Sequence, residues 1–307
     1  MKKAIVTGAN GFIGSMLVKK LLDNSVEVIA ADMVGHNSNI YPEARFVEFD
    51  MRDFTSLKKS VLDTDIDAIY HMAWAGASGP SRADYSLQLD NVKYTCDAVK
   101  TAAEMGIKRF VGAGSLMQID CMAYIGADGS TPNAVSSYGS AKIAAQYMSK
   151  AVANAVGVEH VWCLISNTYG VGNTTMSFVN IASKMLLNGE RASFTAGEQN
   201  YDFVYITDTI NGLYLCGKNG KPNYSYYIGS GKPRKLKEYI VKIRDTIDPN
   251  IPLYLGDIPF NGNSLPIKAY DCTSIMEDTG YVPEVDFNDG IVKTIDWLKE
   301  LKNSTGI

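Results

Sequence analysis

Three glycines spaced three residues apart follow the first apolar run of the chain. Gly8, Gly11 and Gly14 come after residues 4–6, Ala-Ile-Val, and at the start of a helical pattern. Glycine permits the positive φ of a tight turn and a close approach of the backbone, and a helix start offers N–H groups and a positive dipole end to an anion. The segment predicts a pyrophosphate site of a dinucleotide, with contacts from Gly8, Asn10, Gly11, Phe12, Ile13 and Gly14.

An acidic residue is expected about 20 residues beyond such a turn, at the end of the second strand, where it accepts hydrogen bonds from the adenosine ribose. Asp32 has this place, directly after the apolar run at 26–31. Its carboxylate would repel a 2′-phosphate, so the sequence favours NAD over NADP.

A tyrosine and a lysine are placed four residues apart in Tyr138-Gly-Ser-Ala-Lys142. On a helix, residues at i and i+4 share one face. A free tyrosine has a pKa near 10, and a neighbouring ammonium or a positive nicotinamide ring favours the phenolate. Ser115, at the end of the apolar run 110–115, would hydrogen-bond the same substrate oxygen. These three residues predict proton exchange with a hydroxyl or carbonyl group, coupled to hydride transfer.

The elements that must position these residues alternate along the first half of the chain. Short β-branched runs at 3–7, 26–31, 45–49, 68–72 and 109–113 alternate with helical patterns at 12–22, 54–61, 84–104 and 138–156. Strands separated by helical crossovers predict a parallel sheet with helices on both faces, a doubly wound Rossmann fold of the α/β class. Ligands of such folds bind at the carboxyl ends of the strands, where the motifs above fall.

The amino-acid composition changes after the apolar run at 161–165 and becomes richer in Gly, Asn, Pro and Tyr. We therefore expect a dinucleotide-binding domain at 1–166 and a smaller α+β lobe, mainly substrate-binding, at 167–307. A strand near 226–230 is expected to return to the main sheet. Helices of the second lobe are predicted at 176–187, 206–216, 236–246 and 289–301, and the substrate is expected between the two lobes.

Charge and cysteine content narrow the class of protein. A net charge of −4 and a pI near 5.5 argue against a nucleic-acid-binding surface. The five cysteines form no C-x-x-C pair, which suits a reducing compartment, and we predict no metal site. No targeting segment or run of about 18 apolar residues is evident, so we expect a cytoplasmic protein without a membrane partner.

The ordered set of glycine turn, Asp32, Ser115, Tyr138 and Lys142 resembles the extended short-chain dehydrogenase/reductase family, in its nucleotide-sugar epimerase and dehydratase branch. Stretches at 167–170, 202–208 and 227–231 are similar to that branch as well. The resemblance implies an NAD cofactor, a nucleotide-sugar substrate and a homodimer formed through helices 84–104 and 138–156. It also implies further cofactor contacts at Asp50, Met51, Met72, Ala73, Trp74 and Asn91, with His71 as a structural residue.

The chain departs from the family pattern near the reacting centre. Dehydratases of this branch carry Asp-Glu after the Ser/Thr position, whereas Leu116 and Met117 follow Ser115, and neither can move a proton. Arginines that help relatives to bind the nucleotide are replaced by Tyr201 and Leu164. Our candidates for substrate contacts are Ser115, Leu116, Met117, Asn167, Arg191 and Tyr201.

These observations predict an NAD-dependent enzyme that epimerises a nucleotide sugar at C4 through a transient 4-keto sugar. One alternative is a net oxidoreductase, a nucleotide-sugar 4-ketoreductase or 4-dehydrogenase with the same three residues. Another is a non-catalytic nucleotide-binding scaffold, against which the intact Ser115, Tyr138 and Lys142 argue.

Overall fold

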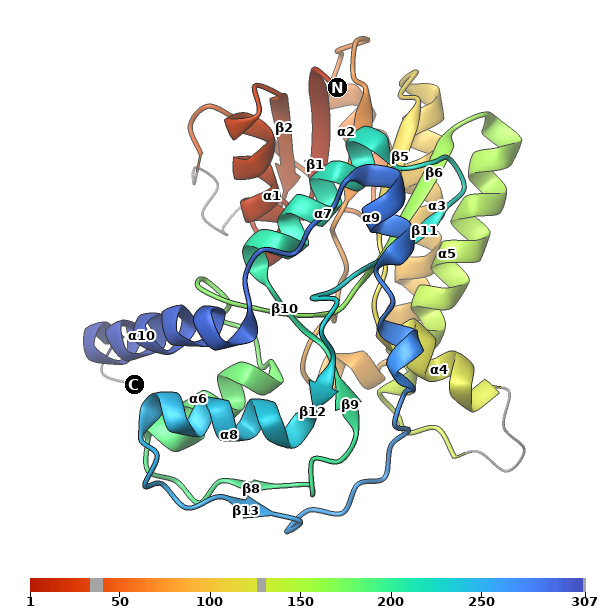
Figure 1. Ribbon diagram of the computed structural model, residues 1–307. Helices are drawn as coiled ribbons and strands as arrows, with labels where there is room; N and C mark the ends of the chain where they lie inside the picture. The colour runs from red at the N-terminus through yellow and green to blue at the C-terminus, as the bar shows by residue number, and fades with distance from the viewer. Residues whose placement is uncertain (34–40, 126–130, 306–307) are drawn as a thin grey trace. The chain divides into compact units, whose positions relative to one another are not determined.

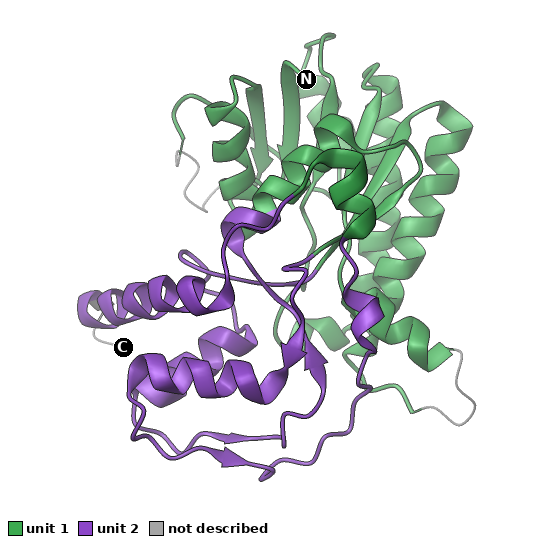
Figure 2. Cartoon of the chain, viewed as in Figure 1, with its two compact units in different colours: residues 1–165, 210–228, 273–281 green, residues 166–209, 229–272, 282–307 purple. Residues whose placement is uncertain are grey.

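The computed structural model of the chain describes residues 1–33, 41–125 and 131–305 (Figure 1). The chain forms two compact units, coloured green and purple in Figure 2. The first comprises Met1–Ile165, Ile210–Ile228 and Thr273–Tyr281. The second comprises Ser166–Thr209, Gly229–Cys272 and Val282–Ile307.

A seven-stranded parallel sheet forms the centre of the first unit, in the spatial order β11-β6-β5-β4-β1-β2-β3. Its strands are β1 (Lys3–Thr7), β2 (Glu27–Asp32), β3 (Arg45–Glu48), β4 (Ala68–His71), β5 (Arg109–Ala113), β6 (Glu159–Ile165) and β11 (Ser225–Ile228). Ile5 pairs with Ile29 on one side and Ile69 on the other, and all three are fully buried. Burial on both faces explains why the strands read as continuous apolar runs. The predicted α/β doubly wound sheet is confirmed.

The strand order reverses between β1 and β4, because the chain leaves β1 toward β2 and β3 and then returns to the other side of β1. In open α/β sheets this reversal leaves a crevice at the carboxyl ends of the strands, where ligands bind. Thr7 ends β1 and His71 ends β4, so the glycine turn and the His71 segment follow the two strands that flank the reversal.

Helices cover both faces of this sheet (Figure 1). One face buries apolar residues of α2 (Phe54–Ser60), α3 (Tyr85–Glu104) and α5 (Ser136–Val156) in a common core with Ile5, Ile29 and Phe110. The other face carries α1 (Phe12–Asp23), α9 (Thr273–Thr279) and the part of α7 (Ile206–Asn219) that belongs to this unit. On this face Tyr70 of β4 lies so close to α7 that a Cβ on Gly217 would be 1.9 Å from its Oη.

Among its described residues the second unit contains three two-stranded pairings, three α-helices that lie wholly within it, and the 3-10 helix η2 (Ile267–Tyr270). The pairings join β7 (Asn167–Tyr169) with β10 (Phe203–Tyr205), β9 (Asn200–Tyr201) with β12 (Arg234–Lys235), and β8 (Ser193–Phe194) with β13 (Tyr254–Leu255). The helices are α6 (Phe178–Leu187), α8 (Leu236–Ile247) and α10 (Phe287–Thr305). Phe203 contacts Tyr239 and Phe287, which joins the strands to α8 and α10.

Two elements next to the candidate site were not predicted. The helix α4 (Met117–Ile125) follows β5, and the short 3-10 helix η1 (Pro80–Ala83) precedes α3. Both are short and follow irregular segments, so the sequence carries no sustained period there. The helix expected from Tyr138 begins two residues earlier, at Ser136. Among the described helices, none combines the length and the apolar composition that a membrane span needs.

Candidate functional site

The glycine turn between β1 and α1 closes on itself and on the segment that follows β4. Gly8 has φ +68°, and the Gly11 N–H donates to the Gly8 carbonyl at 3.1 Å. A Cβ on Gly14 would be 2.0 Å from that carbonyl oxygen, and one on Gly8 would be 2.7 Å from the Ala73 nitrogen. No larger residue fits at either position.

The first turn of α1 has neither a side-chain cap nor an acidic residue. Its N–H groups and the positive end of the helix dipole are therefore available to an anion, as the expected pyrophosphate requires. The structure thus fits a dinucleotide at this turn.

Asp32 ends β2 beside the turn. Its carboxylate accepts hydrogen bonds from the N–H groups of Asn10 and Met33, both at 2.8 Å. In the described part of the chain Asp32 forms no ion pair, so no cation competes for its carboxylate.

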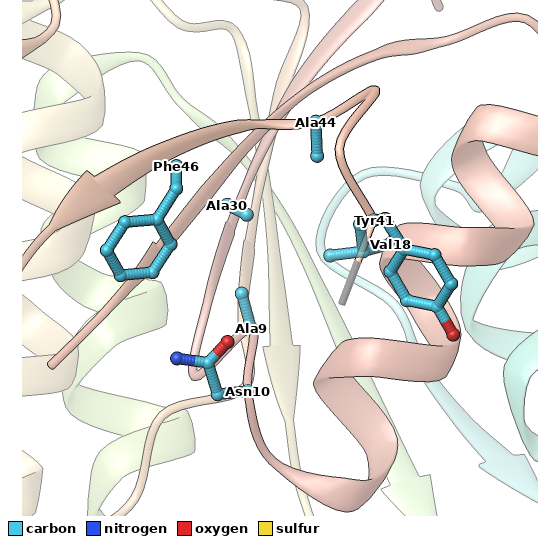
Figure 3. Close-up of a pocket in the computed structure, with 7 residues that line it drawn as sticks. All are labelled: Ala9, Asn10, Val18, Ala30, Tyr41, Ala44 and Phe46. Atoms are coloured by element: carbon cyan, nitrogen blue, oxygen red, sulfur yellow. The ribbon is translucent and has the colours of Figure 1, made fainter. Parts of the chain in front are cut away.

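A small hollow of about 20 Å³ lies against the same turn (Figure 3). It is lined by Ala9, Asn10, Val18, Ala30, Tyr41, Ala44 and Phe46. The buried Asn10 Nδ2 has no hydrogen-bond partner among the described residues. This unused donor beside Asp32 is a second feature that fits the adenosine part of a dinucleotide.

Asp50 and Met51 follow β3. The Asp50 carboxylate accepts from the Arg52 backbone N–H at 2.9 Å and from its guanidinium, whose hydrogen bonds lower the pKa of the carboxyl group. Met51 is half-buried and packs against the core under the sheet. The carboxylate is therefore occupied within its own loop.

The segment after β4 is held in place by buried polar side chains. His71 Nδ1 lies 2.9 Å from Thr7 Oγ1, and burial lowers the pKa of His71 to about 3, so the ring is neutral. The Met72 N–H donates to the Thr7 carbonyl. Asn91 accepts from the Ala75 N–H and donates to the Ala75 carbonyl, both at 2.9 Å. His71 and Asn91 thus position residues 72–75, and Asn91 has little capacity left for direct cofactor contact.

Tyr138 and Lys142 are buried on one face of α5, with 7% and 3% of their surfaces exposed. Lys142 Nζ donates to the Ala113 carbonyl at 2.6 Å and lies 3.5 Å from the centre of the Trp74 ring. It is 5.9 Å from the centre of the Tyr138 ring. Burial lowers the pKa of Lys142 well below its ordinary value, and the charge of Arg82 lowers it further.

Ser115 stands between the end of β5 and the start of α4. The Ser115 N–H donates to Gln118 Oε1 at 3.0 Å, and Ser115 Oγ accepts from the Met117 N–H at 3.2 Å. The Ser115 hydroxyl keeps its own proton available to donate. Burial raises the pKa of Tyr138, while the charge of Arg82 and hydrogen bonding by Ser115 and Arg82 oppose that rise.

The remaining substrate candidates lie in the second unit, except for Leu116 and Met117, which flank the start of α4. Asn167 donates from Nδ2 to the Asp202 carbonyl at 3.1 Å. The ring of Tyr201 packs against Phe178 and Phe203. Arg191 pairs with Asp257 at 2.7 Å and stacks on Tyr254, so its charge is engaged within the unit.

Three polar residues of this region were missed from the sequence. Arg82 packs on the Tyr138 ring, Gln88 bonds to the Trp74 indole, and Gln118 bonds to the Ser115 backbone. Each lies in or beside an unpredicted loop or helix. The one available signal was the Gly79-Pro80 turn just before Arg82.

Comparisons with known proteins agree with this arrangement. The family model described as "NAD dependent epimerase/dehydratase family" matches residues 4–229. The chain is 30% identical to a Methanocaldococcus jannaschii protein described as "Putative UDP-glucose 4-epimerase", covering 96% of this chain and 98% of that protein. It is 21% identical to an Escherichia coli dTDP-glucose 4,6-dehydratase, over 96% and 92% of the two chains. The solved UDP-glucose 4-epimerase of Thermotoga maritima aligns with a TM-score of 0.82 at 21% identity, covering 97% of this chain and 99% of that one.

Proposed function

We propose that this chain, which belongs to the NAD-dependent epimerase/dehydratase family, interconverts the C4 epimers of a nucleotide sugar through a transient 4-keto sugar. The observation that carries the proposal is the grouping of half-buried Ser115 with buried Tyr138 and Lys142 at the carboxyl end of β5. Burial raises the pKa of the Tyr138 phenol and hydrogen bonding by Ser115 opposes that rise, while the Lys142 ammonium is fixed on the Ala113 carbonyl at the end of β5.

The glycine turn would hold the pyrophosphate of NAD, Asp32 and Asn10 the adenosine ribose, and Lys142 the nicotinamide ribose. NAD⁺, when bound, supplies hydride acceptance from the sugar carbon and hydride return to it. Tyr138 takes the proton of the C4 hydroxyl and later gives it back. Ser115 donates its free proton to the same oxygen and fixes its orientation. Rotation of the 4-keto sugar before the hydride returns produces the epimer.

Residues after Ser115 favour epimerisation over dehydration. Elimination of water requires an acid and a base beside the sugar. Leu116 and Met117 occupy the two positions that follow Ser115, and neither side chain carries an ionisable group. Dehydratases are nevertheless among the relatives. A dehydrated product in the assay below would therefore contradict the proposed epimerisation.

A nucleoside diphosphate sugar is supported by the ligands of related structures. A Bordetella bronchiseptica enzyme in complex with NAD⁺ and UDP aligns with a TM-score of 0.82 at 23% identity. For this chain we propose Leu116, Met117, Asn167 and Tyr201 as substrate contacts. Arg191 would join them only by leaving Asp257.

Proton NMR of UDP-, CDP-, GDP- and dTDP-hexoses, incubated with purified protein and NAD⁺ at a level far below the sugar, tests the proposal. Conversion of one sugar to its C4 epimer well beyond the NAD⁺ supplied is the expected result, because the cofactor is regenerated in each cycle. Conversion limited to the NAD⁺ supplied identifies instead a net dehydrogenase or reductase, the second candidate function. A Tyr138→Phe variant should bind NAD and turn over no sugar, and full activity in it would contradict the mechanism.

We also propose a homodimer formed through α3 and α5. These helices pack together, and Tyr85, Leu89, Tyr147 and Met148 leave large apolar side chains exposed on them. Burial of such side chains stabilises a subunit interface. Analytical ultracentrifugation should show a dimer, and Leu89→Glu combined with Met148→Glu should shift it toward monomer. A wild-type monomer at all concentrations would contradict this proposal.

A further inference from the structure

The guanidinium of Arg82 lies directly over the ring of Tyr138. Its Cζ is 4.3 Å from the ring centre, within the range of a cation–π contact. Lys142, the cation that the sequence pairs with Tyr138, lies farther away at 5.9 Å, with its ammonium on the Ala113 carbonyl and the Trp74 ring. The positive charge nearest to the phenol is therefore that of Arg82.

The loop that carries Arg82 is built to hold this position. Gly79 has φ +67° and Pro80 begins η1, which fixes the turn into the short helix. Gln88, buried on α3, donates from Nε2 to the carbonyls of Gly76 and Ser81, both at 3.1 Å. The residue before Arg82 is thus tied to a long helix, and η1 packs against α5.

Arg82 has no carboxylate partner in the described part of the chain. Its Nε is buried and without a hydrogen-bond partner there, and no ion pair includes its guanidinium. By contrast, Arg45, Arg109, Arg191 and Arg234 each pair with an acidic residue. A half-buried cation without an anion is unfavourable, and this cost is offset when a negative charge forms beside it.

Few other titratable groups face Tyr138 from the elements packed around it. Lys142 lies one turn later on α5, Cys121 and Asp120 lie on α4, and His71 ends β4. His71 is neutral, and burial raises the pKa of both Cys121 and Asp120. Arg82 and Lys142 are the two cations in contact with the Tyr138 ring, and Arg82 is the closer to its centre. The charge of Arg82 also lowers the pKa of Lys142, which weakens the contribution of that lysine.

We propose that Arg82 is a positioning residue of the catalytic centre, whose guanidinium fixes the Tyr138 ring and stabilises its phenolate. This role rests on the proposed function, because it makes Tyr138 a base for the C4 hydroxyl. The phenol gives its proton to solvent water to become the base, and the phenolate then accepts the proton of the C4 hydroxyl. Arg82 thus supplies the charge that favours the phenolate, while Lys142 is held for the cofactor ribose.

Fluorine NMR of the protein with fluorotyrosine at position 138 measures the ionisation of this one residue without any sugar. We compare the parent protein with Arg82→Met, Arg82→Lys and Arg45→Met. Arg45 is a matched control, because it is a cation of the same unit paired with Asp63. Arg82→Met should raise the ionisation midpoint by about one pH unit or more, since a neighbouring opposite charge shifts a pKa by this order. Arg82→Lys should give a smaller rise, and Arg45→Met none.

An unchanged midpoint in Arg82→Met, with the variant folded by circular dichroism, would overturn the proposal. So would an equal rise in Arg45→Met. If Arg82→Met does not fold, Arg82→Gln replaces it, because glutamine keeps hydrogen-bonding capacity without the charge. The proposed function is judged by the sugar assay and this inference by the fluorine titration. If the protein turns over no sugar but Arg82→Met shifts the ionisation midpoint, the proposed function is refuted and the role of Arg82 in ionising Tyr138 stands.

Discussion

The ammonium of Lys142 lies 3.5 Å from the centre of the Trp74 ring, and the Trp74 Nε1–H donates to Gln88 at 2.9 Å. The indole thus joins the lysine of α5 to a buried glutamine of α3. Because burial lowers the pKa of Lys142, the aromatic face is one of the few contacts that favour its charged form. Trp74 thus contacts the lysine of the proposed catalytic centre.

Replacing Trp74 with Leu should reduce turnover on the order of tenfold, because a desolvated cation–π contact contributes roughly 1 to 2 kcal/mol. The charged form of Lys142 is present below its pKa and is lost as pH rises through it. The loss of activity on the alkaline side should therefore begin at a lower pH in this variant. Trp74→Phe keeps a ring and is the control. NMR of sugar conversion measures the activity at each pH. If the Leu variant and the wild type lose activity at the same alkaline pH, Trp74 does not stabilise the charged form of Lys142.

Gln118→Met should lower the free energy of unfolding by about 2 to 4 kcal/mol, because it leaves two buried N–H donors without an acceptor. Gln118 Oε1 accepts from the Ser115 N–H and from Trp162 Nε1, both at 3.0 Å. Turnover should also fall, since the bond to Gln118 positions Ser115. Gln146→Met removes the Gln118 to Gln146 bond at 2.6 Å and the bond from Gln146 to Ser225 at 2.7 Å, but it leaves the acceptor of the Ser115 and Trp162 N–H groups in place and should cost less. Urea unfolding measures the free energy of unfolding of both variants. An equal loss in both would contradict the prediction that Gln118→Met is the more destabilising.

Acid should destabilise the protein through His71. Burial lowers the pKa of His71 to about 3 from an ordinary value of 6.5. The unfolded chain therefore binds a proton that the folded chain excludes between these pH values, and stability falls as pH decreases through this window. The cost at pH 5 is about 2 kcal/mol.

His71→Asn should lose less stability than the wild type between pH 7.5 and pH 5 in urea unfolding. Burial also lowers the pKa of His160, to about 4. A His160→Gln variant should therefore also lose less stability than the wild type between pH 7.5 and pH 5. A His71→Asn variant with the same pH dependence as the wild type would show that the ring is not the group responsible.

Asp32→Asn should reduce the preference for NAD over NADP on the order of tenfold, a change of about 1.4 kcal/mol, because it removes the charge that repels a 2′-phosphate. An asparagine still accepts the Asn10 N–H, so the turn should be retained. Asp23→Asn, which alters only a surface pair with Lys19, is the control. Titration calorimetry with both cofactors measures the ratio, and an unchanged ratio in Asp32→Asn would contradict the assignment.

The sequence alone determined the features that depend on local spacing. The glycine turn, the position of Asp32 at the end of β2 and the shared helical face of Tyr138 and Lys142 all follow from chain periods of two or 3.6 residues and from a fixed distance along one supersecondary unit. The alternation of strands and helices likewise predicts a parallel sheet, since parallel strands require crossover connections.

Only the tertiary structure decided which polar groups meet. Arg82 and Tyr138 are far apart in the sequence, and their contact depends on a loop without a repeating pattern packing against α5. Arg191, a substrate candidate from the sequence, pairs with Asp257 in the folded chain, and no local pattern predicts that partner. Side chains in irregular segments have no period that reports their direction. Their partners are set by long-range packing, which brings Arg82 rather than Lys142 closest to the phenol.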